Sequence, residues 1–84
     1  MSEELIGTVT HYFRGPSVAI VHVDDGTLDV GDEIHLLGHT TDFTERVFSM
    51  EVDHLKVGHA SKGEDIAIQV VERARQHDQV FKIS

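Results

Sequence analysis

Short runs in which apolar and polar residues alternate follow one another along most of this chain. In residues 18–23, for example, Ala19, Val21 and Val23 share one face and His22 lies on the other. Alternation with period two, rich in β-branched residues and bounded by glycine or acidic turns, predicts half-buried β-strands. We expect about six strands and no helix. The predicted strands are residues 5–12, 18–23, 32–37, 43–52, 65–71 and 79–83.

Six short strands within 84 residues favour a small closed barrel over an open sheet. Closure removes exposed strand edges, which otherwise invite aggregation. The only proline, Pro16, falls in a predicted loop, and the chain contains no linker or low-complexity tract. We therefore predict an all-β fold, a closed six-stranded antiparallel barrel, formed by residues 1–84 as a single domain.

Two glycine turns have the outline of a phosphate-binding loop without its chemistry. Gly26 and Gly31, and again Gly58 and Gly63, have the spacing G-x-x-x-x-G, but two acidic residues follow each second glycine where Lys and Ser or Thr are required. Carboxylates at that place would repel a nucleotide phosphate, and no helix is predicted to follow. Both stretches are predicted to be turns that enter a strand. We expect no bound nucleotide and no other cofactor.

The charge balance is acidic, with a formal net charge of −8 at pH 7. This charge disfavours nonspecific binding to nucleic acid. Arg73, Arg75 and Lys82 fall close together near the C-terminus, but Glu72 and Asp78 lie among them. The pattern favours a solvated surface of mixed charge in that region.

Metal binding and membrane association are also disfavoured. Cysteine is absent, which excludes disulfides, thiolate ligands and a thiol nucleophile. The nearest histidine pairs are His35 with His39 and His54 with His59; on a strand, a spacing of four places side chains about 13 Å apart, too far to share a metal ion. No stretch approaches the roughly 18 apolar residues of a membrane span, and the N-terminus lacks a basic signal region. We predict a cytoplasmic protein without metal or membrane association.

Catalytic groups cannot be assembled from the sequence. The serines lack the context of a nucleophile elbow, and no serine, histidine and acid can be grouped by their spacing. The acidic pairs fall at predicted turns, where solvated carboxylates are ordinary. We predict that the chain is not an enzyme. A catalytic site, if there is one, is expected on the loops at residues 11–14 or 54–61.

The run HYFRG, residues 11–15, is the one cluster with the chemistry of recognition. Tyr12 and Phe13 could stack on a base or an aminoacyl group while Arg14 meets a phosphate. The alternative is a strand end whose aromatic residue caps the barrel, and this simpler interpretation is favoured. Tyr12, Phe13 and Arg14 are the candidate partner-contact residues.

Four segments taken together, IGTVTHYF, DGTLDVGDEIHLLG, RVFSMEV and ASKGEDIAIQV, resemble the second domain of translational GTPases, the β-barrel of elongation factor Tu and its relatives. The stretch GHTTDFTERVFSM is most similar to small stand-alone elongation-factor-like proteins and to the C-terminal domain of collagenase-like bacterial peptidases. In the closing stretch RARQHDQVFKI, His77 stands where that family usually has a glycine before the aspartate.

The resemblance implies the translation-factor barrel without the GTPase domain. It implies a noncatalytic binding or adaptor module, translation-associated, with RNA or the ribosome as partner. The alternative is a protein-protein accessory module that acts with a peptidase-type enzyme. The matched positions are turn glycines and core residues, so no functional residue is carried over from the family. The partner and the oligomeric state stay open.

Overall fold

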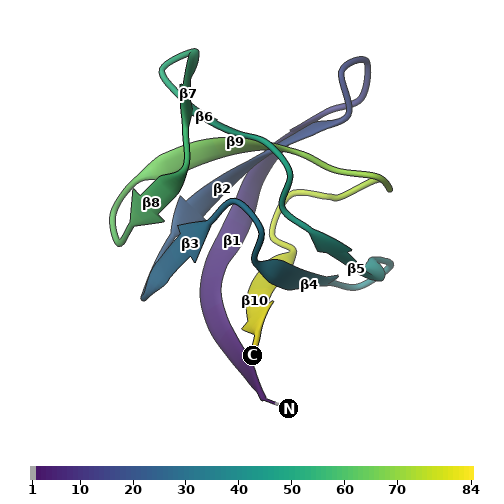
Figure 1. Ribbon diagram of the computed structural model, residues 1–84. Coiled ribbons are helices and arrows are strands. Elements are labelled where there is room, and N and C mark those ends of the chain that lie inside the picture. The colour runs from purple at the N-terminus through teal and green to yellow at the C-terminus, as the bar shows by residue number, and fades with distance from the viewer. Residues whose placement is uncertain (1) are drawn as a thin grey trace.

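The computed structural model describes residues 2–84, which form β-strands joined by short turns (Figure 1). Every strand pairing is antiparallel. The prediction of an all-β fold is therefore confirmed. The strands are β1 (Glu3–Phe13), β2 (Val18–Val23), β3 (Thr27–Asp29), β4 (Glu33–Leu37), β5 (Asp42–Arg46), β6 (Met50–Val52), β7 (Leu55–Val57), β8 (His59–Ser61), β9 (Asp65–Gln69) and β10 (Gln79–Ile83).

Eight of these strands form one sheet in the order β5-β4-β10-β1-β2-β9-β6-β7, and β3 pairs with β8 alone. β5 and β6 follow each other in the chain, yet they lie near opposite ends of this order. Residues 47–49, which join them, can span only about 14 Å when extended. The sheet must therefore curl until its two ends approach each other. Its hydrogen-bonded order nevertheless has two ends, so closure into a ring of six strands stays a prediction.

The strand count differs from the six predicted, for two physical reasons. The predicted strand 43–52 is interrupted at Val47, because its backbone bonds to the turn before β4 instead of continuing the sheet. The Val47 N–H donates to the Asp32 carbonyl at 2.8 Å, and the Val47 carbonyl accepts the Gly31 N–H at 2.8 Å. Phe48, just after this turn, is 55% exposed. The strands β3, β7 and β8 were missed because each has three residues, too few to show an alternating pattern.

The curled sheet encloses a single apolar core. The alternation predicted for residues 18–23 is confirmed, since Ala19, Val21 and Val23 are buried and His22 is not. Leu28 and Ile34, on either side of the first glycine turn, are also completely buried. The buried apolar side chains are Ile6, Val9, Ala19, Val21, Val23, Leu28, Ile34, Leu36, Phe43, Val47, Met50, Ala60, Ile66, Ile68, Val70, Ala74 and Val80.

The two ends of the described chain lie side by side. Ser2 and Ser84 exchange two backbone hydrogen bonds, of 3.0 and 2.9 Å. In Figure 1 both ends lie at the bottom, whereas the β1–β2 and β6–β7 hairpins lie at the top. A tag at either end is therefore remote from these hairpins. No helix in residues 2–84 is long and apolar enough to cross a membrane.

Candidate functional site

A surface hollow of about 310 Å³ lies beside the β1–β2 hairpin, on the outer face of the sheet. We call it the hairpin hollow. Its strand residues Val18, Ile20, Ala67 and Gln69 alternate with core residues, so they point away from the core. The hollow is lined by Phe13, Pro16, Val18, Ile20, Ser49, Glu51, His54, Ala67 and Gln69.

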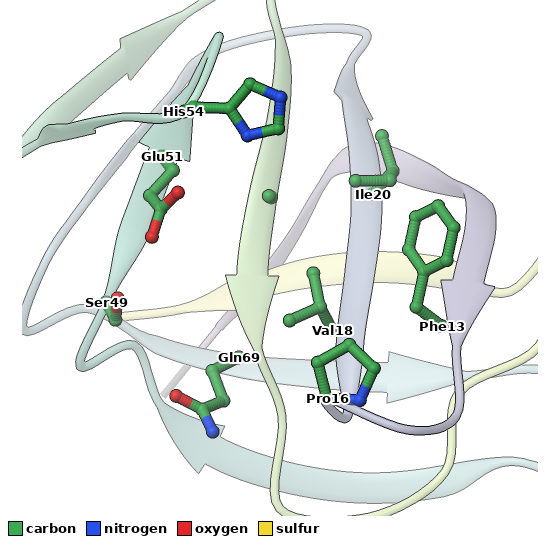
Figure 2. Close-up of a pocket in the computed structure, with 9 residues that line it drawn as sticks. Phe13, Pro16, Val18, Ile20, Ser49, Glu51, His54 and Gln69 are labelled. Carbon is green, nitrogen blue, oxygen red and sulfur yellow. The ribbon is translucent and has the colours of Figure 1, made fainter.

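The two sides of the hairpin hollow differ in chemistry (Figure 2). Phe13, Pro16, Val18 and Ile20 form one side, which is apolar. Across β9, the labelled side chains are polar and include Ser49, Glu51 and His54. An apolar surface beside a few hydrogen-bonding groups is the usual composition of a ligand site, because the apolar part supplies affinity and the polar groups fix orientation.

Backbone strain is concentrated around this hollow. Four non-glycine residues in the described chain have positive φ: Ser17 at 57°, Asp53 at 51°, His54 at 66° and His77 at 79°. Ser17 lies between two lining residues, and Asp53 and His54 form the two-residue turn between β6 and β7, where both central residues need positive φ. Residues held in such conformations cost free energy and cluster at functional sites.

The structure places Tyr12, Phe13 and Arg14, the contact residues predicted from sequence, in three different surroundings. Phe13 is 45% exposed and lines the hairpin hollow. Tyr12 points the other way, is half-buried and packs against the core. Arg14 is exposed in the hairpin turn, and it forms no ion pair within residues 2–84. Strand alternation separates neighbours that sequence reasoning had grouped.

The polar side of the hairpin hollow was missed by sequence reasoning. Glu51 and His54 come from the β6–β7 hairpin, and Gln69 comes from the end of β9. They lie more than thirty residues from Phe13 in the chain. Only the pairing of β9 with both β2 and β6 brings them together. No local sequence signal carries that pairing.

A second arrangement has the connectivity of a hydrolytic triad. Asp29 Oδ1 lies 2.6 Å from His59 Nδ1, and Ser61 Oγ lies 3.2 Å from His59 Nε2. The trio follows from the pairing of β3 with β8, which sets Asp29 opposite His59. His59 and Ser61 fall in residues 54–61, one of the two places where the sequence put a possible catalytic site; the structure has the strands β7 and β8 there instead of a loop.

The surroundings of this trio do not suit acyl transfer. The Ser61 N–H, a natural oxyanion donor, already donates to Glu64 Oε1 at 2.6 Å, which also places a negative charge where an oxyanion would form. The side chains of His59 and Asp29 are 55% and 44% exposed, so water screens their interaction. None of the three lines the hairpin hollow. Asp29, His59 and Ser61 therefore form a hydrogen-bonded cluster on the surface of the β3–β8 pair.

His35 is held between two carboxylates. Its Nδ1 lies 2.7 Å from Glu3 Oε1 and its Nε2 lies 2.6 Å from Asp42 Oδ1. Both ring nitrogens must donate, which only the protonated imidazole can do. The hydrogen bond to Glu3, then that to Asp42, raises the pKa of His35 above its ordinary value. Within residues 2–84, no group of three or more His, Cys, Asp or Glu side chains is placed to hold a metal ion.

Three known proteins match nearly the whole chain by sequence. It is 34% identical over 77 residues to an uncharacterised protease of Methanocaldococcus jannaschii, covering 90% of this chain and 19% of that protein. It is 32% identical over 78 residues to a collagenase of Porphyromonas gingivalis, covering 92% of this chain and 22% of the collagenase. The chain thus spans about a fifth of the length of these relatives. No protein-family model matches it.

Solved structures show the same fold. The C-terminal domain of a Geobacillus thermoleovorans protein named as a U32 peptidase superposes with a TM-score of 0.88, covering 96% of this chain and 93% of that domain at 18% identity. The selenomethionine form of the same domain gives a TM-score of 0.85. The chain therefore shares the fold of that C-terminal domain. Of the resemblances found in the sequence, the one to collagenase-like peptidases is supported; the one to elongation factors stays a prediction.

Proposed function

We propose that this chain is a noncatalytic binding module that acts with a peptidase-type enzyme and that the hairpin hollow is its contact surface for protein. The observation that carries this proposal is the match of over 90% of the chain to about a fifth of a collagenase. Some four-fifths of that relative lies outside the match, so the matched part need not contain the active site. The shared fold with a peptidase C-terminal domain supports the same role.

The hairpin hollow supports a polypeptide as the occupant. A volume of about 310 Å³ is at the lower end for ligand sites, which suits one or two side chains better than a large cofactor. Its apolar side fits an aliphatic or aromatic side chain, and Glu51 and His54 offer hydrogen bonds to the adjacent backbone. Phe13, an exposed aromatic, is the anchor of the contact.

The noncatalytic role is supported by the geometry of Asp29, His59 and Ser61, the only triad-like arrangement in the described residues, which is unsuited to acyl transfer. Its histidine is exposed, and its oxyanion donor is occupied by Glu64. We further infer that the curled sheet corresponds to the closed barrel predicted from sequence, with eight hydrogen-bonded strands in place of six and with residues 47–49 joining its ends by chain continuity in place of hydrogen bonds. A translation-associated RNA partner stays the competing prediction.

The test is affinity purification of the tagged chain from the cells that express it, with and without RNase. Ile20→Gln would place an amide on the apolar side of the hairpin hollow. Leu5→Gln is the matched control, because Leu5 is an exposed aliphatic residue of β1 outside the hollow. We expect a peptidase-type protein to survive RNase, to be lost with Ile20→Gln and to be retained with Leu5→Gln. Recovery of RNA with proteins that vanish after RNase would overturn the proposal.

A further inference from the structure

A second hollow, of about 470 Å³, includes residues from the same end of β1 but has a very different charge. It is lined by His11, Tyr12, Arg73, Ala74, Arg75, Gln76 and His77. We call it the arginine hollow. No acidic residue lines it, although the chain carries a net charge of −8. A cationic site on so acidic a molecule is a departure from its average surface.

The carboxylates that the sequence places beside these arginines are directed elsewhere. Asp78 is only 3% exposed, and its Oδ2 accepts the Arg75 N–H at 2.7 Å. Glu72 lies near Glu45, whose pKa is raised first by burial and further by this neighbouring charge. Neither Arg73 nor Arg75 forms an ion pair within residues 2–84. Both guanidinium groups are therefore available to an external anion.

The turn that forms the arginine hollow holds a histidine in a strained conformation. The Asp78 N–H donates to the Arg75 carbonyl at 3.1 Å, which closes a four-residue turn with His77 at its third position. His77 has φ of 79°, a conformation that glycine adopts without cost. The backbone alone would favour glycine here. A histidine in this position adds a hydrogen-bonding side chain to the hollow at a cost in stability.

The arginine hollow and the hairpin hollow meet at the end of β1. His11 lines the first, Phe13 lines the second, and their ring centroids lie 4.6 Å apart. A single extended segment that crosses this pair of rings would contact both hollows.

We propose that the arginine hollow binds an acidic side chain of a polypeptide, adjacent to the apolar side chain in the hairpin hollow. The identity of that polypeptide rests on the proposed function, but the anion site does not. Arg73 and Arg75 supply the planar, paired donors that carboxylates accept in bidentate form. A nucleic acid fits less well, because its many phosphates would also face the surrounding acidic surface, whereas one or two carboxylates need only the hollow itself.

The test uses fluorescence anisotropy with three labelled probes: a peptide with two glutamates beside a leucine, the same peptide with glutamines, and a single-stranded oligoribonucleotide of similar length. The double variant Arg73→Gln/Arg75→Gln removes the two charges of the hollow. The matched control, Lys56→Gln/Lys62→Gln, changes the net charge equally at exposed residues that do not line it. Thermal unfolding of each variant checks that it is folded.

We expect the glutamate peptide to bind at least tenfold more tightly than the glutamine peptide. The arginine variant should abolish that difference, and the lysine variant should change affinity less than twofold. His77→Gly should weaken binding while the protein becomes more stable. Equal binding of the two peptides, equal losses in both double variants, or tighter arginine-dependent binding of the RNA would each overturn the proposal. If the peptide result holds but no peptidase is recovered from cells, the anion site stands and the proposed function fails.

Discussion

Two histidines of this protein, His35 and His77, lie in opposite electrostatic environments. His35 is largely buried and hydrogen-bonded on both ring nitrogens to carboxylates, which favour its charged form. His77 is exposed beside two arginines, in a backbone conformation that disfavours any side chain. The hydrogen bond of His35 to Glu3 links strands that lie far apart in the sequence. His77 donates its backbone N–H to the Val9 carbonyl at 2.8 Å, but its side chain forms no ion pair within residues 2–84 that would offset the cost of its positive φ.

The contacts of His35 stabilise the fold, whereas the groups around His77 are left available for binding. On an acidic chain, a histidine near a carboxylate is the expected case, and His22, His35 and His59 all follow it. The arginine hollow departs from that pattern, because two arginines and two histidines line it and no acidic side chain does, the nearby Asp78 carboxylate being buried beneath the turn. Groups that are left unpaired at a net cost are better candidates for function than groups that are already satisfied.

The largest effect is expected from Asp78, which positions the arginine hollow without lining it. Asp78→Ala leaves the partly buried Arg75 N–H without its acceptor and should lower the free energy of unfolding by about 2 kcal/mol. Asp78→Asn keeps an acceptor oxygen in the same place and should cost clearly less. Urea denaturation of the two variants measures the difference. Equal losses in both would show that the hydrogen bond to Arg75 does not hold this turn.

His35 should give a pH-dependent effect of about 1 kcal/mol, reduced because its carboxylate partners are partly exposed. Since its pKa is raised in the folded state, its contribution is fully present below the ordinary value of 6.5 and is lost as pH rises through the raised value. His35→Gln should therefore destabilise the protein at about pH 6 and have little effect at about pH 9. A constant loss of stability at both pH values would contradict the charged interaction.

His77→Gly should change the free energy of unfolding least of the three substitutions, and it should raise it where the other two lower it. Relief of the positive φ is expected to raise the free energy of unfolding by about 0.5 to 1 kcal/mol, after the added entropy of glycine in the unfolded chain is subtracted. Differential scanning calorimetry of the purified variant measures it. A decrease in stability would mean that the His77 side chain makes favourable contacts within the molecule, and the contrast with His35 would disappear.

The sequence pattern was sufficient for most strands and insufficient for the site. The predicted bounds 18–23 and 79–83 match β2 and β10. In β2 the alternation reflects a face buried by the core, whereas in β10 only Val80 is buried, and Phe81 and Ile83 are half-buried. The split at Val47 could not be predicted, since it depends on bonds to Asp32 and Gly31, which pattern alone does not connect to it. Phe13, predicted from the sequence as a partner contact, lines the hairpin hollow, and its contact with a partner stays a prediction; the grouping of Phe13 with Tyr12 ignored the alternation of their side chains.

In the sequence, His77 stands where the family of the resemblance usually has a glycine before the aspartate, so it was open whether a tight turn forms there. The structure shows that the turn forms, with His77 in the conformation that glycine would adopt. The sequence also placed Glu72 and Asp78 as neutralising neighbours of the arginines. Burial of the Asp78 carboxylate against the Arg75 N–H depends on the tertiary structure, including the absence of a side chain at Gly38, where a Cβ would lie 1.8 Å from Asp78 Oδ1.

Photo-crosslinking from the position of Phe13 tests whether the hairpin hollow contacts a peptidase-type protein. A photoreactive phenylalanine analogue would replace Phe13 in the tagged chain in living cells, and a second chain would carry it at Val71, which is exposed but lines neither hollow. We expect a crosslink from position 13, and not from position 71, to a peptidase-type protein, and we expect this product to resist RNase. A crosslink from position 13 to RNA, or the same products from both positions, would contradict it.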